Sequence, residues 1–437
     1  MSKKDVHTAP KITLRIFTVL LGFAMLLTAC GAPAATETPV PTQPPAATSP
    51  AATAAPAATG AATAATAGTI KIGQLTDLTS TFTPWGVNVR DGMALAAKEI
   101  NDAGGVNGRK IEIIAQDDQN NGDTGVNRYE QLVQDGVVAV GGIISSGVGV
   151  PVAADAEKLH VPVFLVKSGD AAALTQASRY TFRTCLPAAP MVAQPILQYA
   201  KQQGFTKVGA IVADYPWGHS IQAALEDTFK GSGINIDIEV APVPPNTDFT
   251  PFVRKMADFG AQLIVSTGHP PGTGAIVGLS ADLAGNVPVT GAWSPPDLSV
   301  GGMKDQAIGR FSDFSCADYL GDSYAQLAKS YLAFSSNKFM SDDAVAGYAI
   351  VKMVAQAVGA VGDDPTAIAQ YIHSTTFNEP GYAHPLSWTA WGELAASAPI
   401  FYQIDAGPAP DGLNKAGTWW LKLLSHSAPL TPYEPPQ

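Results

Sequence analysis

Cysteine is scarce in this chain of 437 residues, which contains only Cys30, Cys185 and Cys316. No spacing of Cys and His resembles a zinc site, and the seven histidines are scattered, so we expect no metal centre. Basic residues are also few, because 26 Lys and Arg stand against 37 Asp and Glu, a formal net charge of -11. This acidic balance argues against nucleic-acid binding, which needs a positive footprint, and against broad electrostatic adsorption to anionic lipid.

The sequence also lacks the short motifs that mark common enzymes and nucleotide sites. It has no Gly-x-Ser-x-Gly elbow, no His-Glu-x-x-His, no Gly-x-Gly-x-x-Gly after a strand and no Walker A sequence. We therefore expect no catalytic residue and no cofactor. A Ser-His-Asp site assembled from residues far apart in the sequence is the alternative, and turnover of a candidate ligand by the pure protein would reveal it.

Long hydrophobic runs are absent except near the N-terminus, where residues 16–29 form an uncharged, mostly apolar stretch behind four basic residues. This stretch is shorter than the roughly 20 apolar residues that a membrane span needs, and it predicts a secretory signal over residues 1–29. Its end, Leu27-Thr28-Ala29-Cys30, resembles the lipobox of bacterial lipoproteins, which implies that Cys30 becomes the first mature residue and carries lipid. The alternative is an ordinary secretory signal with a chance Cys. Either interpretation places the mature protein outside the cytoplasm.

A segment of low complexity follows the signal. Residues 31–68 are almost entirely Ala, Thr and Pro, and Glu37 is their only charge. Such a composition cannot bury enough apolar surface to offset the entropy of ordering, so we expect a disordered tether over residues 30–68. A cleaved pro-segment is the alternative. Roughly 360 residues remain for folding, which suggests two domains of ordinary size.

From Thr69 onward, short β-branched runs alternate with amphipathic stretches. Strands are predicted at Thr69–Leu75, Lys110–Asp117, Val137–Ile144, Val161–Lys167 and Tyr180–Thr184. Helices are predicted at Val87–Ala103, Asp123–Gln134 and Val150–Leu159. This β-α-β-α order predicts an α/β fold with a mostly parallel sheet that helices cover on both faces.

The same pattern then restarts, which implies a second lobe of similar make-up. Strands are predicted at Lys207–Ala213, Ile234–Val240, Leu263–Thr267 and Val287–Gly291. Helices are predicted at Ala189–Gln203, Ser220–Lys230, Phe249–Phe259 and Thr273–Leu283. Three later helices, predicted at Ser323–Ser336, Asp343–Val361 and Pro365–Ser374, have no strands between them, so they must complete sheets already built. The Pro-rich end, Leu430–Gln437, is expected to fray.

Several short sequence motifs, in a fixed order, resemble those of a known family. They are Ile70-Lys71-Ile72-Gly73, the run from Gly92 to Gly108, Asp117-Asp118, the run from Gly141 to Ser146, Tyr180 to Thr184, and Asp214 to Gly218. In this order and spacing, residues 69–405 resemble the type I periplasmic solute-binding proteins of ABC transporters, the leucine/isoleucine/valine-binding family.

The resemblance implies two Rossmann-like lobes with parallel sheets, joined by three hinge crossovers, with the ligand trapped between them. Carried onto this chain, lobe 1 is residues 69–184 and 317–384, lobe 2 is residues 186–315 and 386–424, and residues 425–437 form a C-terminal tail. Cys185 and Cys316 then fall near crossover strands. We hypothesise that they form a disulfide across the hinge, and two buried free thiols are the alternative.

Two serines are the first ligand-binding candidates. Ser145 and Ser146 follow a predicted strand and precede a helix, where hydroxyl and backbone N–H groups suit a carboxylate. The resembling family uses this loop for the carboxylate of the ligand. The alternative is that the serines only cap the helix.

The loop after the next strand, Ser168-Gly169-Asp170, holds the amino and carboxylate groups of the ligand in the resembling family. Asp170 stands where that family commonly has Thr. It either pairs with a ligand ammonium group or caps a helix that begins near Ala171, and the sequence leaves both open.

Aromatic residues complete the expected site. Trp85 and Trp217 match the family's aromatic walls in lobe 1 and lobe 2, and Tyr215 is a neighbouring candidate, although a Trp is more commonly part of a core. His269 follows a strand of lobe 2 at a position where the family has an aromatic ligand contact. Trp293 stands where amino-acid-binding members carry an acidic residue for the ammonium group of the ligand.

That missing acid leaves the choice of ligand open. Asp297 is near in sequence but out of register, so the α-amino group of an amino acid has no counter-charge unless Asp170 or Asp77 supplies it. The resemblance implies a branched-chain or other apolar amino acid, and an aromatic or aliphatic acid or an amide is the alternative. The expected partners are this small ligand, an ABC permease and the lipid bilayer through Cys30. We expect a monomer, and an extracellular sensor is a further alternative.

Overall fold

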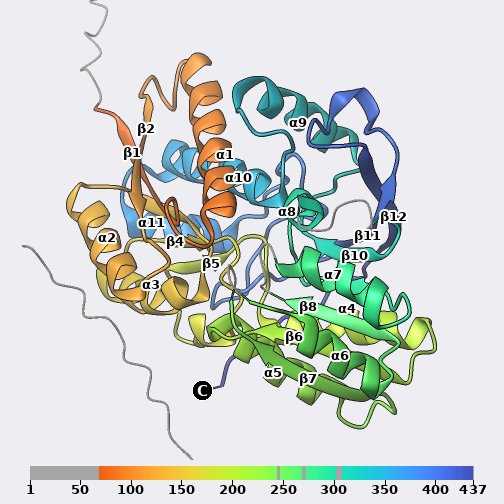
Figure 1. Cartoon of the computed structure of the whole chain (residues 1–437). Helices are drawn as coiled ribbons and strands as arrows, with labels where there is room; N and C mark the ends of the chain where they lie inside the picture. Colours follow the sequence, from red (N-terminus) through yellow and green to blue (C-terminus); the bar gives the residue numbers. More distant parts are fainter. Residues whose placement is uncertain (1–67, 244–246, 268–271, 302–307, 437) are drawn as a thin grey trace, which may run out of the picture. The chain divides into compact units, whose positions relative to one another are not determined.

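The computed structural model describes residues 68–243, 247–267, 272–301 and 308–436 (Figure 1). The predictions for the signal, the tether, Cys30 and His269 lie outside these described residues. The described chain contains two α/β sheets, which confirms the predicted fold class.

The first sheet contains only parallel pairs, in the order β2-β1-β3-β4-β5. Its strands are β1 Ile70–Thr76, β2 Ile111–Asp117, β3 Ala139–Ile143, β4 Val163–Leu165 and β5 Thr181–Arg183. The helices between them are α1 Thr83–Asp102, α2 Gly122–Gln134 and α3 Ser146–Leu159, and a short 3₁₀ turn follows β4 at Ala171–Ala173. Each strand lies within about three residues of its predicted bounds. We call the part of the chain built on this sheet lobe 1.

The second sheet has the order β12-β11-β10-β9-β8-β6-β7 and is mixed. Its strands are β6 Lys207–Ala213, β7 Asn235–Ala241, β8 Leu263–Thr267, β9 Val289–Thr290, β10 Phe311–Ser315, β11 Ile400–Ala406 and β12 Trp419–His426. Its helices are α4 Ala189–Gln202, α5 Pro216–Phe229, α6 Thr250–Phe259, α7 Gly272–Leu283 and α8 Pro296–Gly301. We call the part of the chain built on this sheet lobe 2.

Three strands of lobe 2 were not predicted. β10 pairs in parallel with β9, whereas β11 runs antiparallel to both β10 and β12. The hydrophobic pattern of these segments is weak. β10 contains a buried Asp313, and β12 is exposed from Lys422 to its end. These strands form through pairing with distant segments rather than through their own periodicity.

The three late helices are α9 Asp322–Phe334, α10 Asp342–Val361 and α11 Pro365–Ser374. α10 packs along α1 and reaches β3, so it completes lobe 1 as expected (Figure 1). The two helices touch through glycine, because a Cβ on Gly92 would lie 2.1 Å from the carbonyl oxygen of Ala344. By length and composition α10 is the one described helix able to cross a membrane, but 72% of that stretch is buried, as in a core helix.

The chain passes between the lobes three times, after β5, after β10 and after α11. The structure joins Cys185, beside the first crossing, to Cys316, beside the second, in a disulfide with Cα atoms 5.3 Å apart. This is the pairing that we hypothesised from the resemblance.

The C-terminal segment is ordered against the protein, so the expectation that it frays was wrong. The Leu430 N–H donates to the carbonyl oxygen of Ser397 at 2.7 Å, and Leu430 is buried. Gln194 bonds both backbone groups of Thr431, and Trp391 Nε1 donates to the Tyr433 carbonyl oxygen at 3.0 Å. A Pro-rich segment has few backbone bonds of its own, but here side chains of the folded part supply them.

Candidate ligand-binding site

A cavity with aromatic walls lies between the lobes, at the carboxyl ends of the strands. It holds about 520 Å³ of space free of protein atoms, part of it open to solvent. Lobe 1 contributes Phe82, Trp85, Ile144 and Lys167. The remaining lining residues are Leu186, Tyr215, Trp217, Thr273, Ala292, Trp293, Ser294, Leu298 and Ser299. We call this the aromatic cavity, and its position agrees with the usual place of ligands in open α/β sheets.

Trp85 and Trp217 enter the aromatic cavity from equivalent places in the two lobes. Each stands in the first turn of the helix that follows the first strand of its lobe, and each precedes a glycine. A Cβ on Gly86 would lie 1.9 Å from the Asp77 carbonyl oxygen, and one on Gly218 would lie 1.6 Å from that of Ala213. Glycine therefore lets both helices start against the preceding strand end, which directs each Trp inward.

Phe82 and Tyr215 contact each other across the lobes, with ring centroids 5.7 Å apart. Both residues line the aromatic cavity and also a second, more polar cavity, so they form a partition between the two. Ser145, Gly147, Asn120 and Asp214 are among the other residues of this second cavity, which we call the serine cavity.

The two serines have local partners. Ser145 is the N-cap of α3, and its Oγ accepts the N–H of Gly147 at 3.3 Å. The Oγ of Ser146 accepts the N–H of Asp170 at 3.2 Å. Ser145 lines the serine cavity, whereas neither serine lines the aromatic cavity. The capping alternative therefore describes Ser145, while its place at a cavity wall leaves it available to a ligand carboxylate.

The loop Ser168-Gly169-Asp170 has its carbonyl groups already bonded. Arg183, in β5, donates Nη1 to the carbonyl of Ser168 and Nη2 to that of Asp170. The Gly169 carbonyl accepts the N–H of Ala189 at 3.0 Å. Each of these three carbonyls therefore has one acceptor site used within the protein and a second lone pair left over.

Sequence reasoning missed Arg183, which fixes this loop. Its Nε donates to Glu393 Oε2 at 3.0 Å, and both side chains are fully buried. Burial raises the pKa of Glu393, while Arg183 and backbone N–H groups oppose that rise. A pair of this kind is costly to break, because one partner alone would be an uncompensated buried charge. The arginine inside an apolar strand was the signal that could have drawn attention to it.

The two acids that were considered as counter-charges are engaged elsewhere. Asp77 Oδ1 accepts the N–H groups of Thr79 and Ser80, and its Oδ2 accepts that of Phe82 at 2.8 Å. Asp170 caps the turn at Ala171–Ala173 by accepting the N–H of Ala172 at 2.9 Å, which is the capping alternative. Among the described residues, no acidic side chain lines the aromatic cavity.

Trp293 stands in the wall of the aromatic cavity with an uncommon backbone geometry. Its φ is 64°, its ring stacks on Phe314 with centroids 5.4 Å apart, and only 2% of the residue is exposed. Asp313 holds the turn from behind, since its carboxylate accepts the N–H groups of Trp293 and Ser294 at 2.8 Å each. Burial raises the pKa of Asp313 to about 8. The indole Nε1 is buried without a partner.

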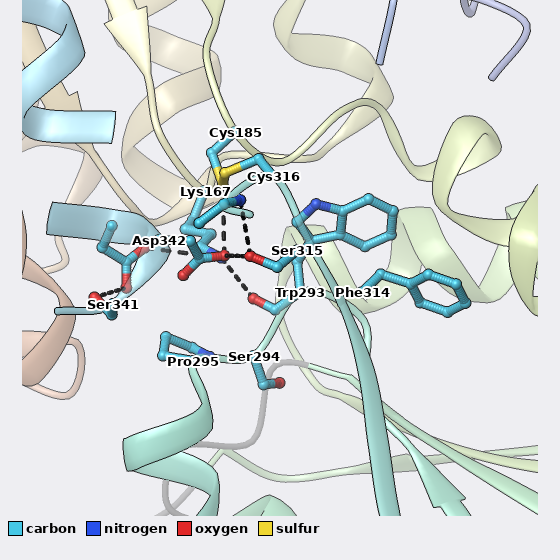
Figure 2. Close-up of polar contacts among 12 residues, drawn as sticks. Lys167, Cys185, Trp293, Ser294, Pro295, Phe314, Ser315, Cys316, Ser341 and Asp342 are labelled. Atoms are coloured by element: carbon cyan, nitrogen blue, oxygen red, sulfur yellow. Dashed lines mark hydrogen bonds and ion pairs between the residues drawn. A yellow bond between two sulfur atoms is a disulfide. The ribbon is translucent and has the colours of Figure 1, made fainter. Parts of the chain in front are cut away.

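Lys167 is the one charged residue among the described lining of the aromatic cavity. Figure 2 shows its ammonium group between the carbonyl oxygen of Trp293 and the carboxylate of Asp342, at 2.7 Å from each. Burial acts to lower the pKa of Lys167, but the carboxylates of Asp342 and Asp343 outweigh it and raise that pKa overall. Its charge is therefore compensated inside the protein rather than offered to a ligand.

The family profile for periplasmic binding proteins matches residues 69–408. This chain belongs to the periplasmic binding protein family. Leu/Ile/Val-binding protein BraC3 of Rhizobium johnstonii is 27% identical over 224 residues, 51% of this chain and 60% of that protein. Leu/Ile/Val-binding protein homolog 1 of Brucella abortus is 26% identical over 313 residues, 69% of this chain and 81% of that protein. The chain spans only 60% and 54% of the first two curated relatives that it matches.

Solved structures of periplasmic binding proteins share this fold. A solute-binding protein from R. palustris, in complex with benzoate, has a TM-score of 0.70 at 17% identity and covers 84% of this chain and 98% of its own. A leucine-binding protein from Thermotoga maritima has a TM-score of 0.70 at 16% identity, covering 82% and 99%. At these identities the likeness shows the fold, which agrees with the resemblance seen in the sequence.

The predicted site residues of this periplasmic binding protein lie in several different places. The structure brings Trp85, Tyr215, Trp217 and Trp293 together around one cavity. Ser145 lines the neighbouring serine cavity, and Ser146, Ser168, Gly169 and Asp170 line neither. The sequence did not single out Phe82 or Lys167 as lining residues.

Proposed function

We propose that this protein is the extracytoplasmic solute-binding component of an ABC importer, anchored to the membrane through lipid on Cys30 and acting as a monomer. The observation that carries the proposal is the aromatic cavity between the lobes, to which both lobes contribute side chains. Membership of the periplasmic binding protein family and the names of its relatives support the transport role. The loaded protein would present its ligand to a membrane permease.

Capture follows from the way the two lobes share the walls. A ligand resting on Trp85 of lobe 1 meets Trp217 and Tyr215 when the hinge closes, and closure removes most of its surface from water. Each Å² of apolar surface so buried contributes about 25 cal/mol. The disulfide beside two of the crossings ties the hinge strands together while the lobes move.

Within this function, the geometry favours an apolar ligand without an α-amino group, such as an aliphatic or aromatic acid or its amide. An ammonium group is best paired with a negative charge, and no acidic side chain is among the described lining of the aromatic cavity. Asp77 and Asp170 bond backbone N–H groups, and the carbonyls of residues 168–170 bond Arg183 and Ala189. The unpartnered Trp293 Nε1 instead suits a ligand that carries a hydrogen-bond acceptor.

A branched-chain amino acid is the second candidate. Its support is the printed description of several relatives as Leu/Ile/Val-binding proteins. For this candidate, the second lone pair of a carbonyl in residues 168–170 would accept the ammonium group.

Isothermal titration with matched ligand pairs tests the ligand class. Leucine against 4-methylpentanoate and phenylalanine against 3-phenylpropanoate differ only in the amino group, and the corresponding amides test the need for a carboxylate. We expect the member without the amino group to bind at least tenfold more tightly, about 1.4 kcal/mol. Tighter binding of leucine would establish the amino acid instead, and failure of the whole panel would reject both classes.

Two further measurements separate the transport role from its rivals. An importer component is required for uptake of the ligand that it binds, so deletion of the gene should abolish uptake of the labelled compound. A sensor would leave uptake intact while abolishing a response. Recovery of the ligand unchanged after prolonged incubation with the protein would argue against an enzyme.

A further inference from the structure

A buried polar contact joins the two lobes at the wall of the aromatic cavity. Lys167 follows β4 in lobe 1, and Trp293 follows β9 in lobe 2. The Nζ of Lys167 donates to the carbonyl oxygen of Trp293 at 2.7 Å, as Figure 2 shows, and Lys167 is only 7% exposed. This bond links the two lobes close to the disulfide, since Asp342, the second partner of Lys167, lies beside Cys185 and Cys316.

Trp293 needs support to hold its backbone geometry. With φ at 64°, it occupies the left-handed region, which is unfavourable for a bulky residue and persists where neighbours hold it in place. Lobe 2 supplies two bonds, from the N–H groups of Trp293 and Ser294 to Asp313. Lys167 supplies a bond on the carbonyl side, and it comes from lobe 1. The turn is therefore held by bonds from both lobes.

Lys167 is itself held in direction. Asp342, at the first residue of α10, accepts its Nζ at 2.7 Å and also accepts Ser315 Oγ at 3.2 Å. The Asp342 N–H donates in turn to Tyr319 Oη at 3.0 Å. A flexible lysine stem gains a fixed direction from this network, so its ammonium group meets the Trp293 carbonyl in one geometry.

We propose that Lys167 is a positioning residue for ligand binding: its ammonium group bonds the carbonyl oxygen of Trp293 and fixes the indole in the wall of the aromatic cavity. The proposal rests on the proposed function and adds a route by which lobe 1 shapes the ligand contact made by lobe 2. Lys167 acts through Trp293 and needs no contact with the ligand.

The test removes the ammonium group together with its nearest carboxylate, while Asp343, 3.8 Å from the Lys167 Nζ, is kept. The variant K167M/D342N loses both partners of the pair, whereas D342N alone keeps the lysine for Trp293. Lys158→Met is the matched control, because Lys158 pairs with Asp155 in the same lobe but is largely exposed. The probes are 4-methylpentanoate and leucine. The measurements are their dissociation constants and the near-ultraviolet circular dichroism of the ligand-free protein, in which the difference between wild type and W293F gives the Trp293 band.

We expect K167M/D342N to bind its probe at least tenfold more weakly than D342N and to lose the Trp293 band, while K158M matches wild type. Lys167→Arg, which keeps charge and donors, should recover most of the affinity and the band. In a W293A background, K167M/D342N should cost little further affinity, because both changes remove the same contact. A purely structural role of the ion pair would give additive losses instead.

Three results would overturn the proposal: affinity of K167M/D342N equal to that of D342N, a retained Trp293 band, or additive losses in the W293A background. If the double variant does not fold, the variant Lys167→Gln is measured in its place with the same expectations. The Gln side chain is one atom shorter than that of Lys, so its donor ends short of the position of the Lys167 Nζ. If neither probe binds the wild type, the proposed ligand class fails. The band of the ligand-free protein then still decides the role of Lys167.

Discussion

Trp293 has both an apolar ring and an unpartnered hydrogen-bond donor in its side chain. Its backbone groups are both bonded within the protein, to Asp313 and Lys167, whereas its indole Nε1–H has no partner. The indole contributes apolar area to the aromatic cavity and an Nε1–H without a partner. A buried donor of this kind favours a ligand that brings an acceptor, because an unsatisfied donor costs free energy.

Trp293→Phe tests that donor, since it removes the N–H and keeps an aromatic ring. We expect the dissociation constant of the best ligand to rise about fivefold to tenfold, the value of roughly one net hydrogen bond. Trp217→Phe serves as the comparison for lost ring area in the same cavity. Calorimetric titration of both variants gives the answer, and unchanged affinity in the W293F variant would show that the ligand makes no bond to the indole.

Asp118 is a buried acid whose titration should affect stability. It is 1% exposed, its Oδ2 has no partner, and burial raises its pKa to about 7. Between the unfolded pKa near 4 and the folded value, the folded protein holds a proton that the unfolded chain has released. The contribution of Asp118 is therefore fully present at low pH and is lost as pH rises toward 7.

Asp118→Asn should flatten that dependence, because the amide does not titrate. One proton is worth about 1.4 kcal/mol per pH unit, so the wild type should lose about 2 kcal/mol more than the variant between pH 5 and pH 7. Urea unfolding at both pH values measures the difference. Parallel pH profiles for the two proteins would show that Asp118 titrates normally.

At the scale of elements, the two lobes position Trp85 and Trp217 through the same arrangement of residues at a helix start. α1 and α5 each begin with proline within the first two positions, followed by Trp and Gly. Proline suits the first turn because its missing N–H would be unsatisfied there. The glycine lets the helix start lie against the strand before it, as the close approach of Gly218 to Ala213 shows.

Gly218→Ala should therefore disturb both packing and binding. The added Cβ would lie 1.6 Å from the Ala213 carbonyl oxygen, so α5 must shift and take Trp217 with it. We expect a loss of about 1–3 kcal/mol in unfolding free energy, as for other overpacked sites, together with weaker ligand binding. Chemical denaturation and titration measure the two effects.

Gly359→Ala is the control, because a Cβ there meets only Val106 at 3.4 Å within a helix. That change should leave binding unaltered and keep or slightly raise stability, since alanine favours helix. If G218A behaved like G359A, the close approach at Gly218 would have no energetic weight.

For the whole molecule, the hinge is the part on which the arrangement of the lobes depends. Cys185 and Cys316 are 131 residues apart in sequence, and their bond ties two of the three crossings. A cross-link that closes so long a loop restricts the unfolded chain strongly.

Replacement of Cys185 and Cys316 by Ala should lower the unfolding free energy by about 2–5 kcal/mol while the fold is retained. Thermal or urea unfolding measures the loss. Mass spectrometry supplies the independent check, because the two thiols of the wild type should accept an alkylating agent only after reduction. Alkylation of both in the native, unreduced protein would contradict the disulfide.

The proposed membrane attachment also concerns the whole molecule. If Cys30 carries the lipid, Cys30→Ser should move the protein from the membrane fraction to the soluble one, because acyl chains contribute about 0.8 kcal/mol per buried CH₂. Fractionation with immunodetection follows the protein, and mass spectrometry of its N-terminus detects the lipid. A soluble wild-type protein would support the ordinary secretory signal instead.

The local sequence was enough to locate most elements. Lys207–Ala213, Leu263–Thr267 and Pro365–Ser374 were predicted with the bounds that the structure has, because their apolar periods are unbroken. Helix starts were placed up to four residues late, as at α3, where the apolar period begins only after the first turn. Capping residues, proline and glycine form that first turn, and they carry no periodic signal.

The sequence by itself determined the α/β class and the two lobes, since these follow from local periodicity, whereas the three crossings and the aromatic wall residues were implied by the family resemblance. Only the tertiary structure decided which polar groups stay available. Asp77, Asp170 and the carbonyls of residues 168–170 are bonded within the protein, while Lys167 reaches Trp293 from the other lobe. Such pairings join residues far apart in the chain, and a buried polar group bonds whichever partner the packing brings near.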